Sequence, residues 1–212
     1  IKHLKKAYAT GDDEISVAGR ETLKLLKLLE TLNYLGYSPS AGAIYPDTDL
    51  GNGLRQAAFL VKGKIGVEVV ALDTHGWDTH VTQGAGEGWH AGLVEHVATC
   101  LSNFSKDMGK DMDRVTVVVK TEFGRRLHEH AGLGTDHGRG SSMFVLGGGV
   151  KGGKIYGKWP GLSEANLDGG NLRVTTDYRA VLAEVLQKRM GVGDTSAIFD
   201  DAVPRALGII DG

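Results

Sequence analysis

The sequence has little cysteine and little proline, and it lacks long apolar runs. Cys100 is the single cysteine among 212 residues, so a disulfide within the chain is excluded and the redox compartment cannot be inferred. With only 4 prolines, a proline-rich linker is excluded as well. No apolar stretch approaches the roughly 18 residues of a membrane-spanning helix, so we expect no membrane span.

An excess of charge of one sign is also missing. The 24 Lys and Arg residues and the 26 Asp and Glu residues leave a formal net charge of −2 at pH 7. Basic residues are interspersed with acidic ones rather than gathered in a run. Proteins that bind nucleic acid or an anionic membrane surface need a basic face. We therefore expect neither of these partners.

Glycine is the residue in excess. It occupies 32 of 212 positions, about twice the usual share of ~7%, without the three-residue period of collagen. Many of these glycines lie at 76–92 and 124–153, where we expect tight loops. The 41% of hydrophobic residues suffices for one sizeable core or two small ones. We expect a single domain over 1–212, with a helix and a loop at 1–50 and the core at 51–212.

The spacing of apolar residues predicts alternating helices and strands. Leu23, Leu26 and Leu29 recur at helical spacing, whereas the β-branched run VEVVAL at 67–72 favours a buried strand. We expect helices at 13–32, 54–61, 89–108 and 176–190, strands at 67–72, 114–119 and 142–146, and an irregular loop at 33–52. This order is typical of an α/β layer fold with a largely parallel sheet.

Histidines and acidic residues gather after the first predicted strand. Seven of the eight histidines lie between positions 75 and 137. The motif DTHGWDTH, which contains Asp73, Asp78 and His80, directly follows the strand at 67–72. In parallel sheets, loops converge and ligands bind outside the carboxyl ends of the strands. We therefore expect these side chains to line a site.

The second predicted strand ends in a similar way. Glu122 and Arg125 follow the strand at 114–119, and Asp136 and His137 come after the glycine-rich segment HEHAGLG. Carboxylate oxygens mixed with imidazole nitrogens suit zinc, manganese or iron better than calcium. Such clusters on neighbouring strand ends could hold one ion, or a close pair that clamps a phosphoryl or sulfuryl oxygen.

Several of these residue types also have a structural interpretation. Asp and His after a strand often form turns and helix caps, and Arg near a carboxylate often forms an ion pair. We interpret His96 as a surface residue of its helix and do not expect His128 and His130, in a polar loop, to be ligands. Cys100 is interpreted as a small core residue. The string GGGVKGG is interpreted as a turn, because it lacks the spacing of a P-loop.

Four motifs, in the same order over about residues 50 to 210, resemble the bacterial proteins that carry domain of unknown function 1501. The motifs are DTHGWDTH, VKTEFGRR, TDHGRGSSMFVLGGGVKGGKIYG and TTDYRAVLAEVLQKRMG. These proteins are often labelled sulfatase-like and are grouped with the alkaline phosphatase superfamily. The resemblance implies an alkaline-phosphatase-like three-layer α/β/α sandwich with a mostly parallel sheet and a metal site at its carboxyl edge.

The resemblance also implies what would lie outside this sequence. The first strand and the nucleophile of the family would precede Ile1, so the sandwich would be incomplete at its N-terminus. A twin-arginine export signal, which the family tends to carry, would place the protein in the periplasm or cell envelope. Without that signal the location would be cytoplasmic.

Carried over by position, the resemblance implies a set of site residues. Asp73, Asp78, His80, Glu122, Asp136 and His137 would hold one or two divalent metal ions, most readily zinc or manganese, and Arg125 would neutralise a small anionic ester substrate. Two departures from the superfamily pattern are visible. Phe123 follows Glu122 where the superfamily has a histidine, and Cys100 lacks the C-x-P-x-R context in which sulfatases form their nucleophile.

These expectations lead to three hypotheses about function. The first is a metal-dependent hydrolase of phosphate or sulfate esters whose nucleophile lies upstream of this chain. The second is a non-catalytic metal-binding or assembly module of the cell envelope with the same fold. In the third, the Asp and His clusters serve only as turn formers and no ion binds. The substrate and the oligomeric state do not follow from the sequence.

Overall fold

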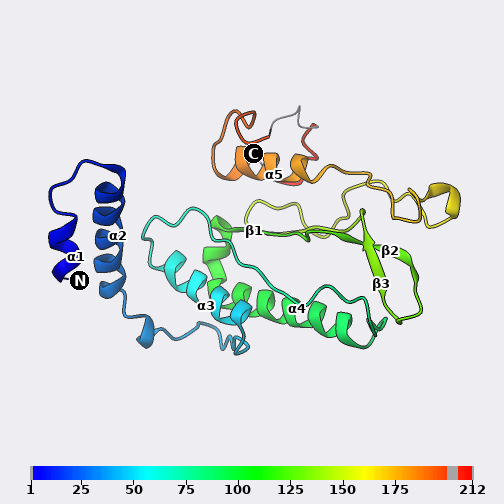
Figure 1. The fold of residues 1–212 in the computed structure, drawn as a ribbon, viewed down its shortest axis with the longest axis horizontal. Helices are drawn as coiled ribbons and strands as arrows, with labels where there is room; N and C mark the ends of the chain where they lie inside the picture. Colours follow the sequence, from blue (N-terminus) through cyan, green and yellow to red (C-terminus); the bar gives the residue numbers. More distant parts are fainter. Residues whose placement is uncertain (1, 200–204, 212) are drawn as a thin grey trace.

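The computed structural model of the chain describes residues 2–199 and 205–211, and Figure 1 shows its helices and strands. The α-helices are α1 (Lys2–Ala7), α2 (Glu14–Thr31), α3 (Asp49–Lys62), α4 (Trp89–Met108) and α5 (Tyr178–Arg189). Short 3-10 helices are η1 (Tyr34–Gly36), η2 (Gly109–Arg114) and η3 (Glu164–Asn166). The strands are β1 (Thr116–Val119), β2 (Gly124–Glu129), β3 (Thr135–Gly138) and β4 (Phe144–Gly147).

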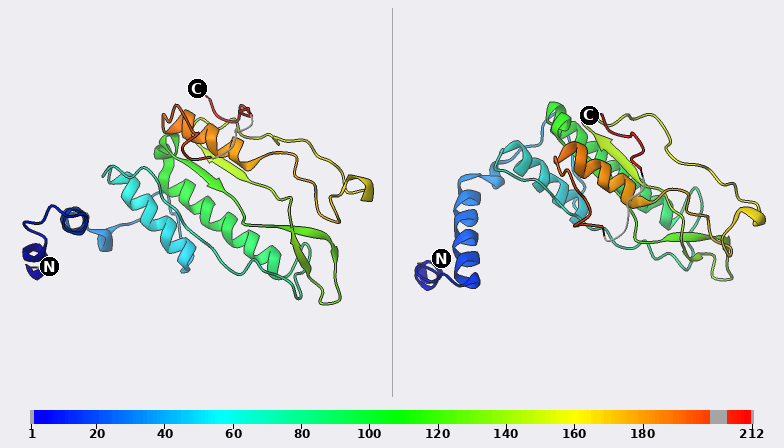
Figure 2. Two further views of the ribbon diagram at one scale, coloured as in Figure 1. Left: turned by 45° about the horizontal axis from the view of Figure 1, so that its top comes forward. Right: turned by 90° about the horizontal axis from the view of Figure 1, so that it is seen from above.

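Helices α1 and α2 form a hairpin that stands apart from the remaining elements in the views of Figures 1 and 2. Asp13 caps α2, since its carboxylate accepts hydrogen bonds from the Ser16 backbone N–H at 3.0 Å and from the Ser16 hydroxyl at 2.6 Å. The helix predicted at 13–32 is therefore confirmed. Several of its leucines remain exposed, including Leu25 and Leu28.

Helices α3 and α4 pack against each other and form the main core. Leu54 and Ala58 of α3 contact a buried group on α4 that includes Cys100 and Phe104. Cys100 is fully buried, which confirms its predicted role as a small core residue. The core extends to Val117, so α3 and α4 cover one face of strand β1.

The end of α4 is fixed by a buried carboxylate. Asp107 is 1% exposed and accepts hydrogen bonds from the Tyr37 hydroxyl at 2.6 Å, the Tyr45 hydroxyl at 2.9 Å and the Ser40 backbone N–H at 2.7 Å. It also pairs with the ammonium group of Lys62 at the end of α3. One side chain thus joins two helices to the loop that precedes α3.

The strands form two small antiparallel sheets. β1 pairs with β4, with Val117 opposite Leu146, and β2 pairs with β3, with Arg125 opposite His137. β4 also contacts α5, because Val145 packs on the cluster of Val181, Ile209 and Ile210. The β1–β4 pair therefore lies between the α3–α4 core and α5, as Figure 1 shows.

The predicted three-layer α/β/α sandwich with a mostly parallel sheet is wrong. Over residues 2–199 and 205–211 no strands pair in parallel. The connection from β1 to β4 contains the β2–β3 hairpin instead of a helix, whereas a parallel pair needs a crossover connection, usually helical. The segment 67–72 forms no strand: Val69 is 68% exposed and Val70 is 44% exposed. β-Branched residues stabilise a strand only where a neighbouring strand gives them a surface to pack on.

Helix α5 lies within the helix predicted at 176–190, but it begins two residues later and ends one residue earlier than expected. The Asp177 carboxylate caps it by accepting from the Arg179 backbone N–H at 2.8 Å, and Gly191 beyond its end has a φ of 70°. Glu184 on its buried face accepts the backbone N–H groups of Gly208 and Ile210 at 2.9 and 2.8 Å. In the described part of the chain, none of the helices is both long and apolar enough to span a membrane.

Candidate metal centre

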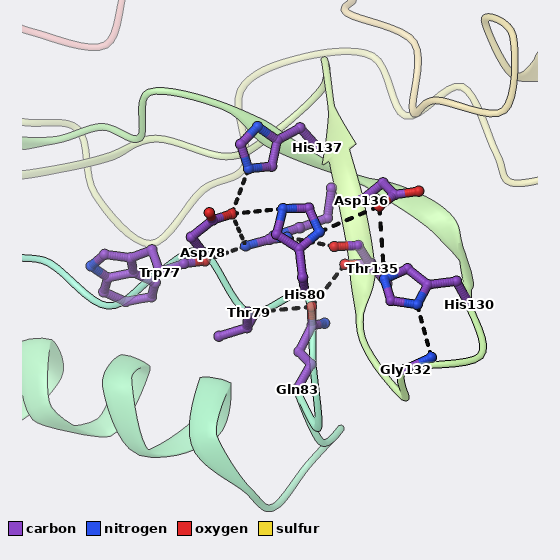
Figure 3. A network of polar contacts seen from close by, with 11 residues as sticks. Trp77, Asp78, Thr79, His80, Gln83, His130, Gly132, Thr135, Asp136 and His137 are labelled. Carbon is purple, nitrogen blue, oxygen red and sulfur yellow. Dashed lines mark hydrogen bonds and ion pairs between the residues drawn. The ribbon is translucent and has the colours of Figure 1, made fainter.

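The candidate site lies where the loop containing DTHGWDTH meets the β2–β3 hairpin (Figure 3). The backbone N–H of Thr82 donates to the carbonyl of Gly132 at 2.9 Å, and that of Gln83 donates to the carbonyl of Leu133 at 2.8 Å. The Gln83 side-chain oxygen accepts from the hydroxyls of Thr79 at 3.0 Å and Thr135 at 2.7 Å. The loop and the hairpin are therefore joined by both backbone and side-chain contacts.

A glycine permits this close approach. A Cβ atom on Gly134 would lie 2.2 Å from the carbonyl oxygen of His80, which is far inside the normal contact distance. Only glycine therefore lets the hairpin turn rest on the backbone of the loop. The predicted role of glycine in tight loops around the site is confirmed at this position.

The first cluster consists of Asp78, His80 and His137, whose possible ligand atoms all lie within 4.8 Å of one another. Asp78 Oδ1 lies 2.5 Å from His137 Nε2 and 3.0 Å from His80 Nε2. The two imidazole rings stack with their centroids 4.9 Å apart, and Phe123 stacks on the other side of His137 at 4.0 Å. Two nitrogens thus converge on one carboxylate oxygen beside an aromatic support.

The hydrogen bond from His137 is the largest reason why the pKa of the Asp78 carboxyl is held below its ordinary value. Desolvation of Asp78 opposes that effect, while the nearby charges of His80, His137 and Arg125 add to it. The side chain of Asp78 is 62% exposed and that of His137 is 50% exposed, so small molecules and ions can reach the cluster.

The second cluster consists of His80, His130 and Asp136, and it shares His80 with the first. Asp136 Oδ1 lies 3.3 Å from His80 Nδ1 and 3.7 Å from His130 Nε2. The two ring nitrogens of His80 therefore face different carboxylates, Asp78 on one side and Asp136 on the other. Figure 3 shows the His80 ring between them.

Arg125 connects the loop to the hairpin next to the first cluster. Its guanidinium donates to the carbonyls of Thr135, at 2.5 Å, and Trp77. It also lies 3.6 Å from Asp78 Oδ1, and its side chain is only 16% exposed. The group lies over the ring of Phe123 at 5.0 Å. Arg125 thus brings a positive charge to the cluster and orients the segment that carries Asp78.

The structure brings five of the seven predicted site residues together. They are Asp78, His80, Arg125, Asp136 and His137. Asp73 and Glu122 are exposed and belong to neither cluster, so their predicted role as ligands has no geometric support among the described residues.

His130 was not predicted as a site residue, because it lies in a polar segment and its distance along the sequence from the other histidines and acidic residues matches no known metal-binding motif. The available signal was the glycine-rich turn AGLG between His130 and Asp136, which is typical of a hairpin and would bring the two flanking segments side by side.

The donor set of the first cluster fits a transition-metal ion. Two imidazole nitrogens and one carboxylate oxygen suit zinc, manganese or iron, and a three-ligand set leaves coordination positions open for water or a substrate. An isolated pair of carboxylates would have favoured a harder ion such as magnesium or calcium instead. The cluster therefore meets the chemical requirement for a catalytic or binding metal centre.

Comparisons with known proteins give one match. A search of the curated proteins and a search of the solved structures each returned no match. A family model described as "Protein of unknown function (DUF1501)" matches residues 59–201. This segment contains both clusters, Arg125 and all four described strands. The match spans more than half of the chain, and so the chain belongs to the DUF1501 family of proteins of unknown function.

Proposed function

We propose that Asp78, His80 and His137 bind one divalent metal ion, zinc or manganese, and that the protein takes part in metal-dependent hydrolysis of small phosphate or sulfate esters. The observation that carries the proposal is the convergence of two imidazole Nε2 atoms on one Asp78 oxygen. Asp78 lies in a loop, whereas His137 lies in strand β3, 59 positions further along the chain. Turn formation alone would not require that convergence.

A bound zinc or manganese ion would polarise an ester oxygen and lower the pKa of a water molecule at the site. The residues of the chain have separate roles in this proposal. Asp78 and the two histidines hold the ion, and Phe123 supports the His137 ring by stacking. Arg125 keeps its predicted role of neutralising an anionic ester, and its bonds to two carbonyls hold its charge in place.

A second candidate function is a metal-binding module without catalysis, acting in the cell envelope. One observation favours it: the nearby hydroxyls of Thr79 and Thr135 both donate to the amide oxygen of Gln83, which cannot act as the general base that would activate them as nucleophiles. A hydrolase would then need a water molecule or a residue outside the described segments as its nucleophile. The periplasmic or envelope location remains a proposal that follows from the family resemblance.

Metal analysis and activity assays distinguish these functions. Purified chain that is dialysed against zinc or manganese should retain about one ion, and addition of the ion at 100 times its Kd should stabilise the fold by about 2.7 kcal/mol. His137→Ala should abolish both effects. His128→Ala is the matched control, because His128 lies exposed on the same hairpin outside both clusters. Wild-type protein that neither binds nor is stabilised by either ion would overturn the proposal.

Activity then separates the two candidates. Turnover of p-nitrophenyl phosphate, bis(p-nitrophenyl) phosphate or p-nitrophenyl sulfate that disappears in His137→Ala supports the hydrolase. Stoichiometric metal binding without turnover of any of the three supports the non-catalytic module.

A further inference from the structure

In the second cluster, a backbone N–H group determines which ring nitrogen of His130 carries the proton. The N–H of Gly132 donates to Nδ1 of His130 at 3.0 Å. A ring nitrogen that accepts a hydrogen bond carries a lone pair and no proton, so neutral His130 carries its proton on Nε2. That nitrogen faces Asp136 Oδ1 at 3.7 Å. His130 thus presents a proton to the carboxylate and has no lone pair there for a metal ion.

Asp136 also faces His80. The same oxygen, Oδ1, faces His80 Nδ1 at 3.3 Å. Asp78 lies nearer, 3.0 Å from Nε2, so the two carboxylates compete for the proton of the metal-free ring. Once an ion binds Nε2, the proton lies on Nδ1, where the Asp136 carboxylate stabilises it. Asp136 therefore favours the tautomer in which His80 binds an ion through Nε2.

The local backbone supports this arrangement. A Cβ atom on Gly132 would lie 2.9 Å from Cε1 of the His130 ring, so a larger residue would displace the ring from its donor. The rings of His130 and His80 lie roughly parallel, with an interplanar angle of 21° and centroids 6.3 Å apart. The turn of the hairpin therefore positions the imidazole that faces Asp136.

We infer that Asp136 and His130 are positioning residues that fix the tautomer and ring orientation of His80, and that they do not hold a second ion. The inference rests on the proposed function, because it assigns His80 Nε2 as a metal ligand. Metal-bound histidines commonly donate their other ring N–H to a carboxylate, and loss of that partner lowers metal affinity about 10- to 100-fold. The sequence-based expectation of one or two ions becomes one ion, and Asp136 becomes an orienting group.

The protonation of the rings can be observed directly. Long-range ¹H–¹⁵N NMR of the ¹⁵N-labelled chain distinguishes which ring nitrogen carries the proton. We expect His130 to be protonated on Nε2 both without metal and with one equivalent of zinc. In the zinc-loaded chain we expect His80 to be protonated on Nδ1 and bound to zinc through Nε2. A His130 ring that is protonated on Nδ1, or that binds zinc through Nε2, overturns the inference.

Calorimetric zinc titrations of variants give a second readout. Asp136→Ala should lower zinc affinity about 10- to 100-fold while the stoichiometry stays at one ion. Asp136→Asn should recover part of the loss, since the amide oxygen can still accept from His80, and His128→Ala should bind as the wild type does. Two ions per wild-type chain, one of them lost in Asp136→Ala, would overturn the inference, as would an unchanged affinity in Asp136→Ala.

The failure of the proposed function is distinguishable from the failure of this inference. Wild-type chain that binds no zinc refutes the metal site, and with it the assignment of His80 as a ligand. One ion bound with unchanged affinity in Asp136→Ala refutes only the positioning role. Should Asp136→Ala lose its fold, as checked by circular dichroism, the wild-type NMR spectra decide the question alone.

Discussion

Asparagine in place of Asp107 tests how the helical core is fixed, and we expect it to lower the free energy of unfolding by about 2 to 4 kcal/mol. The carboxylate accepts three hydrogen bonds, from Tyr37, Tyr45 and Ser40, and pairs with Lys62. Removing one partner of a buried ion pair costs about 3 to 5 kcal/mol. Lys62 is 20% exposed and also donates to the Ser40 hydroxyl, so it regains some solvation, and the expected cost is about 1 kcal/mol lower than that range.

Urea denaturation followed by far-UV circular dichroism measures this change. Tyr37→Phe is the graded comparison, because it removes one donor to Asp107 and should cost about 1 kcal/mol. A loss below about 0.5 kcal/mol in Asp107→Asn would place it among ordinary surface substitutions and would refute the reasoning.

The same network predicts a pH dependence. Burial raises the pKa of the Asp107 carboxyl, but the bonds from Lys62, Tyr37, Ser40 and Tyr45 outweigh burial and hold it below its ordinary value of 3.8. A carboxyl whose pKa is lower in the folded state stabilises the fold above its unfolded pKa, and this contribution is lost as the pH falls through the folded pKa. The stability difference between wild type and Asp107→Asn should therefore be full at pH 7 and should shrink below about pH 4.

Three further changes test other contacts. Phe104→Ala should cost about 3 to 5 kcal/mol in urea denaturation, because the ring is 3% exposed in the α3–α4 core; a cost below 1 kcal/mol would contradict this packing. Glu184→Ala should destabilise by about 2 to 3 kcal/mol by leaving two backbone N–H groups unpaired, and an unchanged thermal midpoint would refute it. Gly134→Ala should weaken zinc binding because its Cβ would meet the carbonyl of His80; wild-type affinity in a calorimetric titration would contradict that contact.

Helices were predictable from the sequence because their signals are local. The leucines of α2 recur at helical spacing within a few residues of one another. The caps Asp13 and Asp177, which were not singled out from the sequence, also lie within three residues of the backbone groups that they satisfy. The sheet was not predictable in the same way. The run at 67–72 has strong β-propensity, but Val69 has no strand beside it, and that depends on distant parts of the chain.

The candidate site was predicted in part, and for a different geometric reason. Asp78 and His80 were expected beside His137 because strand ends converge in a parallel sheet. They do lie together, but the contact is made by the turn of the β2–β3 hairpin, which rests on the loop at Gly134. His130 joins them through that same turn. Its role depends on the fold of the hairpin, which residue spacing alone did not reveal.

A calorimetric titration of the metal-free chain with zinc tests the central claim most directly. The account predicts a single class of site with about one ion per chain, abolished in His137→Ala and retained in His128→Ala. It also predicts a rise in the thermal midpoint on zinc addition, since an ion that binds only the folded state stabilises it. No binding heat and no thermal shift with either zinc or manganese would contradict the claim that Asp78, His80 and His137 form a metal centre.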